Sequence, residues 1–260
     1  MYSKIALSIG GSDSGGGAGI QADLRTFMSI KVHGCTAITC ITAQNSIGVT
    51  GVEAVETNIL IKQINALFSD FEIHSLKTGM LLNERIIIST SKKLREYFIP
   101  KIIDPVMVSR TGVKLIEDNA INAYKKMLFP QADIVTPNIY EANLLSDFEI
   151  KNEEDVEISA QEILKFGPKA VLIKGGGLKS SKGKDFYINK NGKREWLISK
   201  FIKTSNTHGS GCTLSAAICS YVALGYDLIE SVKKSKTFIE RSLEKSYQIG
   251  AGPGPLGHYQ

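Results

Sequence analysis

Short apolar runs alternate with segments of helical periodicity along most of the chain. The first run, at 5–9, has the length of a buried strand and is followed by a glycine-rich loop at 10–19 and a helical pattern at 20–30. Further strands are expected at 37–43, 76–80, 101–104, 133–136 and 170–174, and further helices at 59–71, 84–97, 119–128 and 156–166. Such alternation is typical of a doubly wound, mainly parallel central sheet with helices on both faces. The sequence therefore predicts an α/β fold.

The last third of the chain departs from this alternation. Apolar segments at 186–188 and 195–198 flank Asn191-Gly192, a dipeptide typical of a tight turn, and predict a late β-hairpin. Two helices are expected after it, at 211–224 and 228–247. The glycine- and proline-rich tail at 250–260 is expected to be a surface cap or a frayed end. No repeat or low-complexity linker interrupts the pattern, so we expect one domain over 1–260.

Composition and charge exclude several classes of partner. The 260 residues include 31 Lys and Arg and 26 Asp and Glu, and the resulting net charge of +5 is spread among acidic residues. We therefore expect no nucleic-acid partner. No apolar stretch approaches the roughly 18 residues of a membrane span, so we expect neither membrane insertion nor a targeting segment. The four cysteines form no C-x-x-C pair, which indicates reduced thiols and a cytoplasmic protein.

Polar and glycine-rich segments follow the predicted strands at their carboxyl ends. In a doubly wound sheet these ends share one edge, and ligands bind there. The residues expected at this edge are the loop 10–19, Gln44, Met80, Asp104, Asn138, Glu141, Lys174 and the segment 207–212.

The segment 207–212 carries the strongest chemical signal. Gly209 and Gly211 flank Ser210 just before a run of small residues that is typical of a buried helix. The N–H groups and the positive dipole end of such a helix start favour an anion, and glycine allows a phosphate oxygen to approach. A thiolate at Cys212 would be stabilised there. On this motif alone, a glycine-rich turn with Cys212 packed as a small apolar side chain stays open.

The glycine loop does not by itself indicate a nucleotide site. Residues 17–22 match the dinucleotide pattern G-x-G-x-x-A, but positions 37–52 lack the acidic residue that would bind the ribose. The P-loop pattern G-x-x-x-x-G-K-[ST] is absent from the sequence. A dinucleotide fold of this type and a P-loop are therefore not expected.

Phosphoryl transfer needs an anion cradle, a cation bridge and a base. The amides of 209–212 are candidates for the cradle, and Cys212 for the base that accepts a hydroxyl proton. Asp104 and Glu141 carry oxygen ligands suited to Mg²⁺, and Lys174 can neutralise phosphate oxygens. Structural alternatives stay open: a turn residue before proline for the aspartate, a first-turn acid for the glutamate and a solvated strand end for the lysine.

Seven short motifs follow one another in a fixed order. They are GGSDSGGGAGIQADL at 10–24, AQN at 43–45, KTGM at 77–80, DPVM at 104–107, TPN with EA at 136–142, KGG at 174–176 and THGSGCTLSAA at 207–217. Together they resemble the hydroxymethylpyrimidine kinase / phosphomethylpyrimidine kinase family of thiamine biosynthesis, nearly from end to end. The resemblance implies a ribokinase-like fold, ATP and Mg²⁺ as cofactors, a homodimer, and two successive phosphorylations, of a hydroxymethylpyrimidine and then of its monophosphate.

The resemblance also implies roles for individual residues. It makes Gln44 the contact to the aminopyrimidine ring, and a glutamine amide does offer a donor and an acceptor side by side. The implied pocket wall or floor consists of Gly11, Ala18, Asp23, Met80 and Val106. The implied nucleotide-phosphate contacts are Asn138, Lys174 and Thr207. Sugar kinases of the wider superfamily carry aspartate where Cys212 stands, so the cysteine indicates the pyrimidine and pyridoxal branch.

Two other functions stay open at this point. One is a pyridoxal or pyridoxine kinase of the same fold, and the other is a protein that binds a pyrimidine without phosphorylating it. His208 also has two interpretations, as a spacer or neighbour of a bound phosphate and as an ordinary loop histidine.

Overall fold

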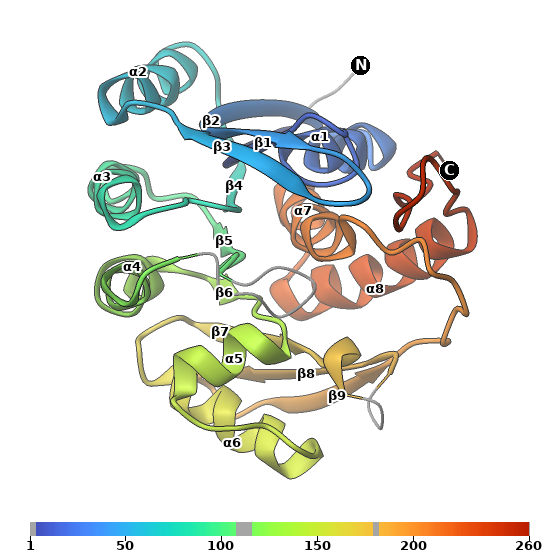
Figure 1. Cartoon of the computed structure of the whole chain (residues 1–260). Coiled ribbons are helices and arrows are strands. Elements are labelled where there is room, and N and C mark those ends of the chain that lie inside the picture. The colour runs from blue at the N-terminus through green and yellow to red at the C-terminus, as the bar shows by residue number, and fades with distance from the viewer. Residues whose placement is uncertain (1–3, 108–115, 179–181, 260) are drawn as a thin grey trace. The chain divides into compact units, whose positions relative to one another are not determined.

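Strands and helices alternate along the chain as the sequence predicts (Figure 1). The computed structural model describes residues 4–107, 116–178 and 182–259. Contacts group the chain into two compact units, Met1–Leu81 with Ile202–Gln260 and Leu82–Phe201. The single domain over 1–260 stays a prediction. Within the described ranges, no helix is both long enough and apolar enough to cross a membrane.

The first unit is built on a sheet with the strand order β3-β2-β1-β4. β1 (Ile5–Asp13) pairs in parallel with β2 (His33–Gln44) and with β4 (Ser75–Thr78), and β3 (Val49–Ala54) runs antiparallel to β2. β3 is missing from the sequence prediction because all of its residues are exposed, so no apolar alternation marks it. β1 also continues through 10–13, which the prediction placed in a loop.

The helices of this unit are α1 (Gly19–Ser29), α2 (Thr57–Phe68), α7 (Ser210–Ala223) and α8 (Leu228–Glu244). Of these, α1, α2 and α7 contact the strands, and α8 packs against α7. α7 contacts α1, α8, β1 and β4. It is buried along most of its length because its residues are mainly Ser, Ala, Thr and Cys, which allow close approach of neighbouring elements. The start of α7 is therefore held firmly by the core of its unit.

The C-terminal tail is docked on the first unit, beside α8 (Figure 1). The N–H of Gly257 donates to the carbonyl oxygen of Ser242 at 3.0 Å, and the N–H of His208 donates to the carbonyl oxygen of Gly254 at 3.1 Å. Residues 254–258 are buried. A frayed end is therefore wrong for this segment, which supports the chain just before α7.

His258 makes stability depend on pH. Burial and the nearby charge of Arg25 lower the pKa of His258 from 6.5 to about 4. As the pH falls, His258 is thus protonated near pH 6.5 in the unfolded chain but only near pH 4 in the folded protein. Stability is complete above pH 6.5, and we expect a loss of about 3 kcal/mol as the pH falls to 4.

Urea unfolding at several pH values, with His258→Gln for comparison, measures this contribution. Gln stays neutral and can still accept a hydrogen bond from Thr213 Oγ1, which lies 2.9 Å from His258 Nε2. The variant should lose less stability between pH 6.5 and 4 than the original chain. Identical losses in the two proteins would contradict the assignment.

The second unit is built on a sheet with the strand order β5-β6-β7-β8-β9. Its strands are β5 (Lys101–Ile103), β6 (Ile134–Val135), β7 (Ala170–Lys174), β8 (Lys184–Asn189) and β9 (Arg194–Ile198). The first three are parallel, and the last two form the predicted antiparallel hairpin.

The helices of this unit include one irregular segment. They are α3 (Glu84–Leu94), α4 (Asp118–Ala123), α5 (Ile139–Ser146) and α6 (Glu153–Leu164). The predicted helix at 119–128 divides into α4 and a π-helical turn, η1 (Tyr124–Leu128), which is followed by the 3₁₀ turn η2 (Phe129–Gln131). Another 3₁₀ turn, η3 (Gly175–Gly177), follows β7.

Candidate active site

The predicted site residues form one group in each unit. The first unit holds Gly11, Ala18, Asp23, Gln44, Met80, Thr207, Gly209, Ser210, Gly211 and Cys212. The second unit holds Asp104, Val106, Asn138, Glu141 and Lys174. In the first unit, Gly11, Gln44 and Met80 lie at or near the carboxyl ends of β1, β2 and β4, whereas Asp23 lies within α1 and the segment 207–212 leads into α7. In the second unit, the residues lie at or after the carboxyl ends of β5, β6 and β7, as the sequence predicts.

Asp13 shapes the glycine loop of the first unit. Its Oδ1 accepts a hydrogen bond from the N–H of Gly15 at 2.8 Å, and its Oδ2 accepts from the N–H groups of Gly17 at 3.1 Å and Ala18 at 2.8 Å. Burial raises the pKa of this carboxyl group, but hydrogen bonds from His208, Ala18 and Gly15 outweigh burial and leave the pKa below its usual value. Asp13 is therefore an ionised anchor that gives the loop its shape.

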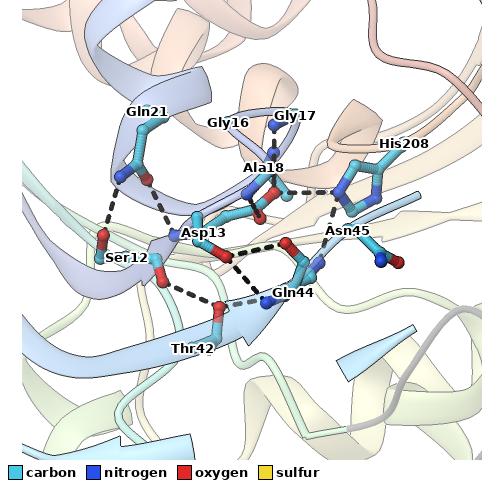
Figure 2. A network of polar contacts seen from close by, with 12 residues as sticks. Ser12, Asp13, Gly16, Gly17, Ala18, Gln21, Thr42, Gln44, Asn45 and His208 are labelled. Carbon is cyan, nitrogen blue, oxygen red and sulfur yellow. Dashed lines mark hydrogen bonds and ion pairs between the residues drawn. The ribbon is translucent and has the colours of Figure 1, made fainter. Parts of the chain in front are cut away.

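Gln44 lies at the end of β2 and belongs to the same polar network (Figure 2). Its Nε2 is 3.3 Å from Nε2 of His208, which in turn is 3.0 Å from Oδ2 of Asp13. The Gln44 Oε1 is 3.3 Å from the hydroxyl of Thr42, and this hydroxyl donates to the carbonyl oxygen of Ser12 at 2.9 Å. The side chain of Gln44, which is predicted to bind the substrate ring, is thus held by Thr42 and His208.

The glycine loop and the segment 207–212 are in direct contact. Gly209 has a φ of 80°, and a Cβ atom there would overlap the carbonyl oxygen of Gly17. A Cβ atom at Gly17 would overlap the ring of His208. Both glycines therefore allow an approach that no other residue permits without displacing a neighbour.

Cys212 lies in the first turn of α7, which begins at Ser210 directly after Gly209. The thiol is partly exposed, as are Thr207, Ser210 and Gly211. The positive end of the helix dipole lies at this turn and favours both a phosphate group and a thiolate. The backbone N–H groups at the start of α7 and the side chain of Cys212 therefore lie within one helical turn of each other.

Two of the predicted pocket residues are neighbours. A Cβ atom at Gly11 would lie 3.0 Å from Cε of Met80 and 2.8 Å from Sγ of Cys40. Gly11 and Met80 are therefore in contact. Ala18 precedes Gly19, where a Cβ atom would overlap the carbonyl oxygen of Gly11. Gly11 therefore lies next to Met80 and also next to Gly19, the residue that follows Ala18.

Asp23 lies in the interior instead of on an open wall. Its side chain is 1% exposed, and both carboxylate oxygens accept from Nζ of Lys77 at 2.9 Å. Oδ2 also accepts from the hydroxyl of Ser8 at 2.6 Å. This arrangement favours a structural ion pair beneath the site, and direct contact between Asp23 and a substrate stays a prediction.

In the second unit, the buried carboxylate of Asp104 forms an ion pair with the partly buried Lys174. Lys174 Nζ donates to Asp104 Oδ1 at 2.9 Å, and the hydroxyl of Thr136 donates to the same oxygen at 3.3 Å. The Lys174 side chain is 14% exposed, so the ammonium group is not the solvated strand end of the structural alternative. Val106, predicted as pocket wall, is partly exposed two residues after Asp104.

Glu141 and Asn138 cap the start of α5. The N–H of Glu141 donates to Oδ1 of Asn138 at 2.9 Å, and the N–H of Asn138 donates to Oε2 of Glu141 at 2.8 Å. Burial, with the negative charge of Asp104, raises the pKa of Glu141 to about 7, although the charge of Lys174 acts in the opposite direction. Glu141 is therefore a capping residue as well as a buried acid that a cation would stabilise as a carboxylate.

The two acids fit a magnesium ion that shares its coordination with a nucleotide. Among the residues that the structure describes, no group of three or more His, Cys, Asp or Glu side chains could hold a metal ion. Mg²⁺ commonly binds one or two carboxylates together with waters and phosphate oxygens. Asp104 and Glu141 supply that number of carboxylates.

Sequence reasoning missed three residues of these networks. The sequence places Asp13 in a glycine-rich loop, and an aspartate before several glycines is a common anchor of a turn. The sequence places Lys77 in a strand, and a lysine inside a buried strand indicates a charged partner. For His208 the two interpretations left open did not include a pair with Asp13, and no local pattern indicates it.

Comparison with known proteins shows close relatives over the whole chain. The family model described as phosphomethylpyrimidine kinase matches residues 13–257. The hydroxymethylpyrimidine/phosphomethylpyrimidine kinase of Synechococcus elongatus is 48% identical over 261 residues, which cover 100% of this chain and 98% of that relative.

Two solved structures are similar to this one. The phosphomethylpyrimidine kinase of Clostridium difficile is 42% identical with a TM-score of 0.82, over 91% of this chain and 98% of that chain. The ADP complex of Bacillus subtilis pyridoxal kinase is 35% identical with a TM-score of 0.91, over 98% of this chain and 97% of that chain. These similarities confirm the predicted α/β fold of the ribokinase-like type.

Proposed function

This chain belongs to the phosphomethylpyrimidine kinase family, and we propose that it phosphorylates 4-amino-5-hydroxymethyl-2-methylpyrimidine and then the resulting monophosphate in thiamine biosynthesis. The enzyme is a phosphotransferase, as its relatives are. ATP is the proposed phosphoryl donor, which the ADP complex of the related Bacillus subtilis structure supports.

The observation that carries the proposal is the position of Cys212 in the first turn of α7 directly after Gly209. The thiolate accepts the proton of the substrate hydroxyl while the oxygen bonds to the γ-phosphorus and ADP leaves. The start of α7 stabilises the charge on the transferred phosphoryl group. The base and the anion site thus come from one rigid helix, which keeps their separation fixed.

Gln44 supports a pyrimidine as the substrate. Its amide belongs to a polar network that restricts its rotation, and it offers a donor beside an acceptor. An aminopyrimidine carries the complementary pair, a ring nitrogen beside an exocyclic amine. The contact between Gln44 and this edge of the ring is part of the proposal.

The second unit supplies charge for the nucleotide. We assign Asp104 and Glu141 of this unit to Mg²⁺, and Lys174 and Asn138 of this unit to the phosphates. Thr207, from the first unit, is also assigned to the phosphates. Bound Mg²⁺ would supply positive charge to the phosphate oxygens. Lys174 adds an ammonium group that Asp104 holds in place at 2.9 Å.

The assembly and location of the protein are further parts of the proposal. We propose a cytoplasmic homodimer, which the exposed valines 49 and 52 of β3 support because they offer apolar surface to a second copy. Light scattering should give twice the mass of one chain, and cell fractionation should find the protein with soluble metabolic enzymes. The mass of one chain would contradict the dimer, and recovery in the membrane fraction would contradict the cytoplasm.

A pyridoxal kinase is the second candidate, favoured by the TM-score of 0.91 to the Bacillus subtilis structure. An ADP-release assay with the pyrimidine alcohol and with pyridoxal, each with Mg²⁺ and ATP, separates the candidates. We expect faster turnover of the pyrimidine, and in Gln44→Leu a KM for the pyrimidine that is about 10-fold higher or more. Turnover of pyridoxal alone would favour the second candidate, and binding of the pyrimidine without ADP release would favour a non-catalytic protein.

A further inference from the structure

Three side chains from distant parts of the first unit meet at one ring nitrogen. Nε2 of His208 lies 3.0 Å from Oδ2 of Asp13 and 3.3 Å from the amide nitrogen of Gln44 (Figure 2). These residues come from the end of β1, the end of β2 and the segment before α7. Their meeting point adjoins the glycine loop that Asp13 anchors.

The Asp13 carboxylate decides which ring nitrogen of His208 carries a hydrogen. Hydrogen bonds keep the pKa of Asp13 below its usual value, so the group is ionised and only accepts. Oδ2 of Asp13 also accepts from the N–H groups of Gly17 and Ala18. A stable contact at 3.0 Å therefore requires a hydrogen on Nε2 of His208. A nitrogen that donates in this way cannot also accept a hydrogen bond from an amide N–H of Gln44.

We propose that Asp13 and His208 form a positioning pair that turns the oxygen of the Gln44 amide toward His208 and its NH₂ group toward Thr42. The two ends of a glutamine amide have nearly the same shape, so this orientation keeps every atom position. The NH₂ group then donates to the hydroxyl of Thr42, which donates to the carbonyl oxygen of Ser12 at 2.9 Å. Each hydrogen in this chain of contacts then has an acceptor.

The His208 ring has little freedom to leave this position. It lies against Gly17, where a Cβ atom would overlap the ring. The backbone N–H of His208 donates to the carbonyl oxygen of Gly254 at 3.1 Å, which fixes the main chain from the docked tail. The ring is therefore oriented by packing as well as by Asp13.

A fixed amide orientation selects the ligand. The second N–H of Gln44 and the second lone pair of its oxygen stay available, and they present a donor and an acceptor in one order only. This edge matches a ring nitrogen beside an exocyclic amine, which pyridoxal lacks. This step rests on the proposed function, since it assigns the aminopyrimidine edge of the substrate to Gln44. The pair acts through Gln44 and so affects discrimination more than the chemical step.

Nitrogen NMR of histidine-labelled protein tests the orientation without any substrate. We expect His208 in the Nε2–H form in the ligand-free protein, and a change of tautomer or an averaged signal in Asp13→Asn. The Nδ1–H form in the original chain would overturn the proposal, whether or not the protein is a pyrimidine kinase.

Kinetics with paired substrates tests the selection. In His208→Phe, which keeps a ring of similar size but removes the N–H, we expect the KM for the aminopyrimidine to rise about 10-fold and kcat to change less than about 3-fold. The second substrate is an analogue of the pyrimidine that lacks the exocyclic amine. The ratio of kcat/KM for the aminopyrimidine to kcat/KM for this analogue should fall by about the same factor as KM rises. His208→Gln can place an N–H near the same point and should recover part of the preference.

Controls separate this role from a merely structural one. His33→Phe changes an exposed histidine at the start of β2 and should leave KM and preference unchanged. The proposal would be overturned if His208→Phe kept the full preference for the aminopyrimidine over the analogue without the amine. It would also be overturned if kcat fell equally with the aminopyrimidine and with that analogue. If the original chain does not phosphorylate the pyrimidine, the proposed function fails. The positioning pair can still be tested then, because calorimetry with the aminopyrimidine and with the analogue without the amine measures the same preference as a ratio of Kd values.

Discussion

Replacing Cys212 by alanine should lower kcat with the pyrimidine alcohol by about 10²- to 10⁴-fold, the usual contribution of a general base. The thiol is partly exposed in the first turn of α7, where a helix dipole favours the thiolate. Without the sulfur, the substrate hydroxyl has to lose its proton to water while the anion site stays intact. Binding of ATP should therefore change little, and the loss should fall on the chemical step.

Cys219→Ala is the matched control, since this cysteine lies on the same helix. Burial raises the pKa of Cys219 to about 12, so this thiol cannot serve as a base near neutral pH. ADP release by both variants, with ATP affinity measured in parallel, gives the comparison. We expect Cys219→Ala to retain kcat. A Cys212→Ala protein that keeps kcat within about threefold would remove the proposed base from the mechanism.

Removing Lys77 should cost about 3–5 kcal/mol of unfolding free energy, because it leaves the Asp23 carboxylate buried without its ammonium partner. The two side chains are each 1% exposed, and Lys77 Nζ donates to both carboxylate oxygens at 2.9 Å. Lys77→Met keeps most of the apolar stem of the side chain. The loss therefore reports the unpaired charge and little else.

The double variant Asp23→Asn with Lys77→Met distinguishes lost pairing from lost packing. It removes both charges and should recover a large part of the stability, measured as the urea midpoint and slope. Lys165→Met, which removes an exposed pair with Glu162, should leave the midpoint nearly unchanged. A double variant that is less stable than Lys77→Met would show that the ion pair itself has little influence.

The pattern of apolar residues was sufficient for most of the fold. The first five residues of β1 and most of β7 are apolar runs that are almost completely buried, and Asn191-Gly192 marks the β8–β9 hairpin. β3 has no such signal because its residues are all exposed, and only its pairing with β2 makes it a strand. For the tail the sequence left a surface cap and a frayed end open, and the choice between them depends on distant residues such as Ser242 and Asn206.

Residue types and local patterns indicated which residues belong to the site, but they did not indicate which of these residues contact one another. The glycines around Ser210 and the position of Cys212 in the first turn of α7 agree with the local pattern. The contact between Asp13 and His208 joins positions 195 residues apart, and nothing local predicts it. Asn138 and Glu141 follow the capping pattern, whereas the raised pKa of Glu141 depends on burial and on Asp104.

The most direct test of the account is ³¹P NMR of the products formed from the pyrimidine alcohol, ATP and Mg²⁺. We predict a phosphate ester of the pyrimidine that appears first and a pyrimidine diphosphate that replaces it, with both signals strongly reduced in Cys212→Ala. ATP consumption without any phosphate ester of the pyrimidine would contradict the account.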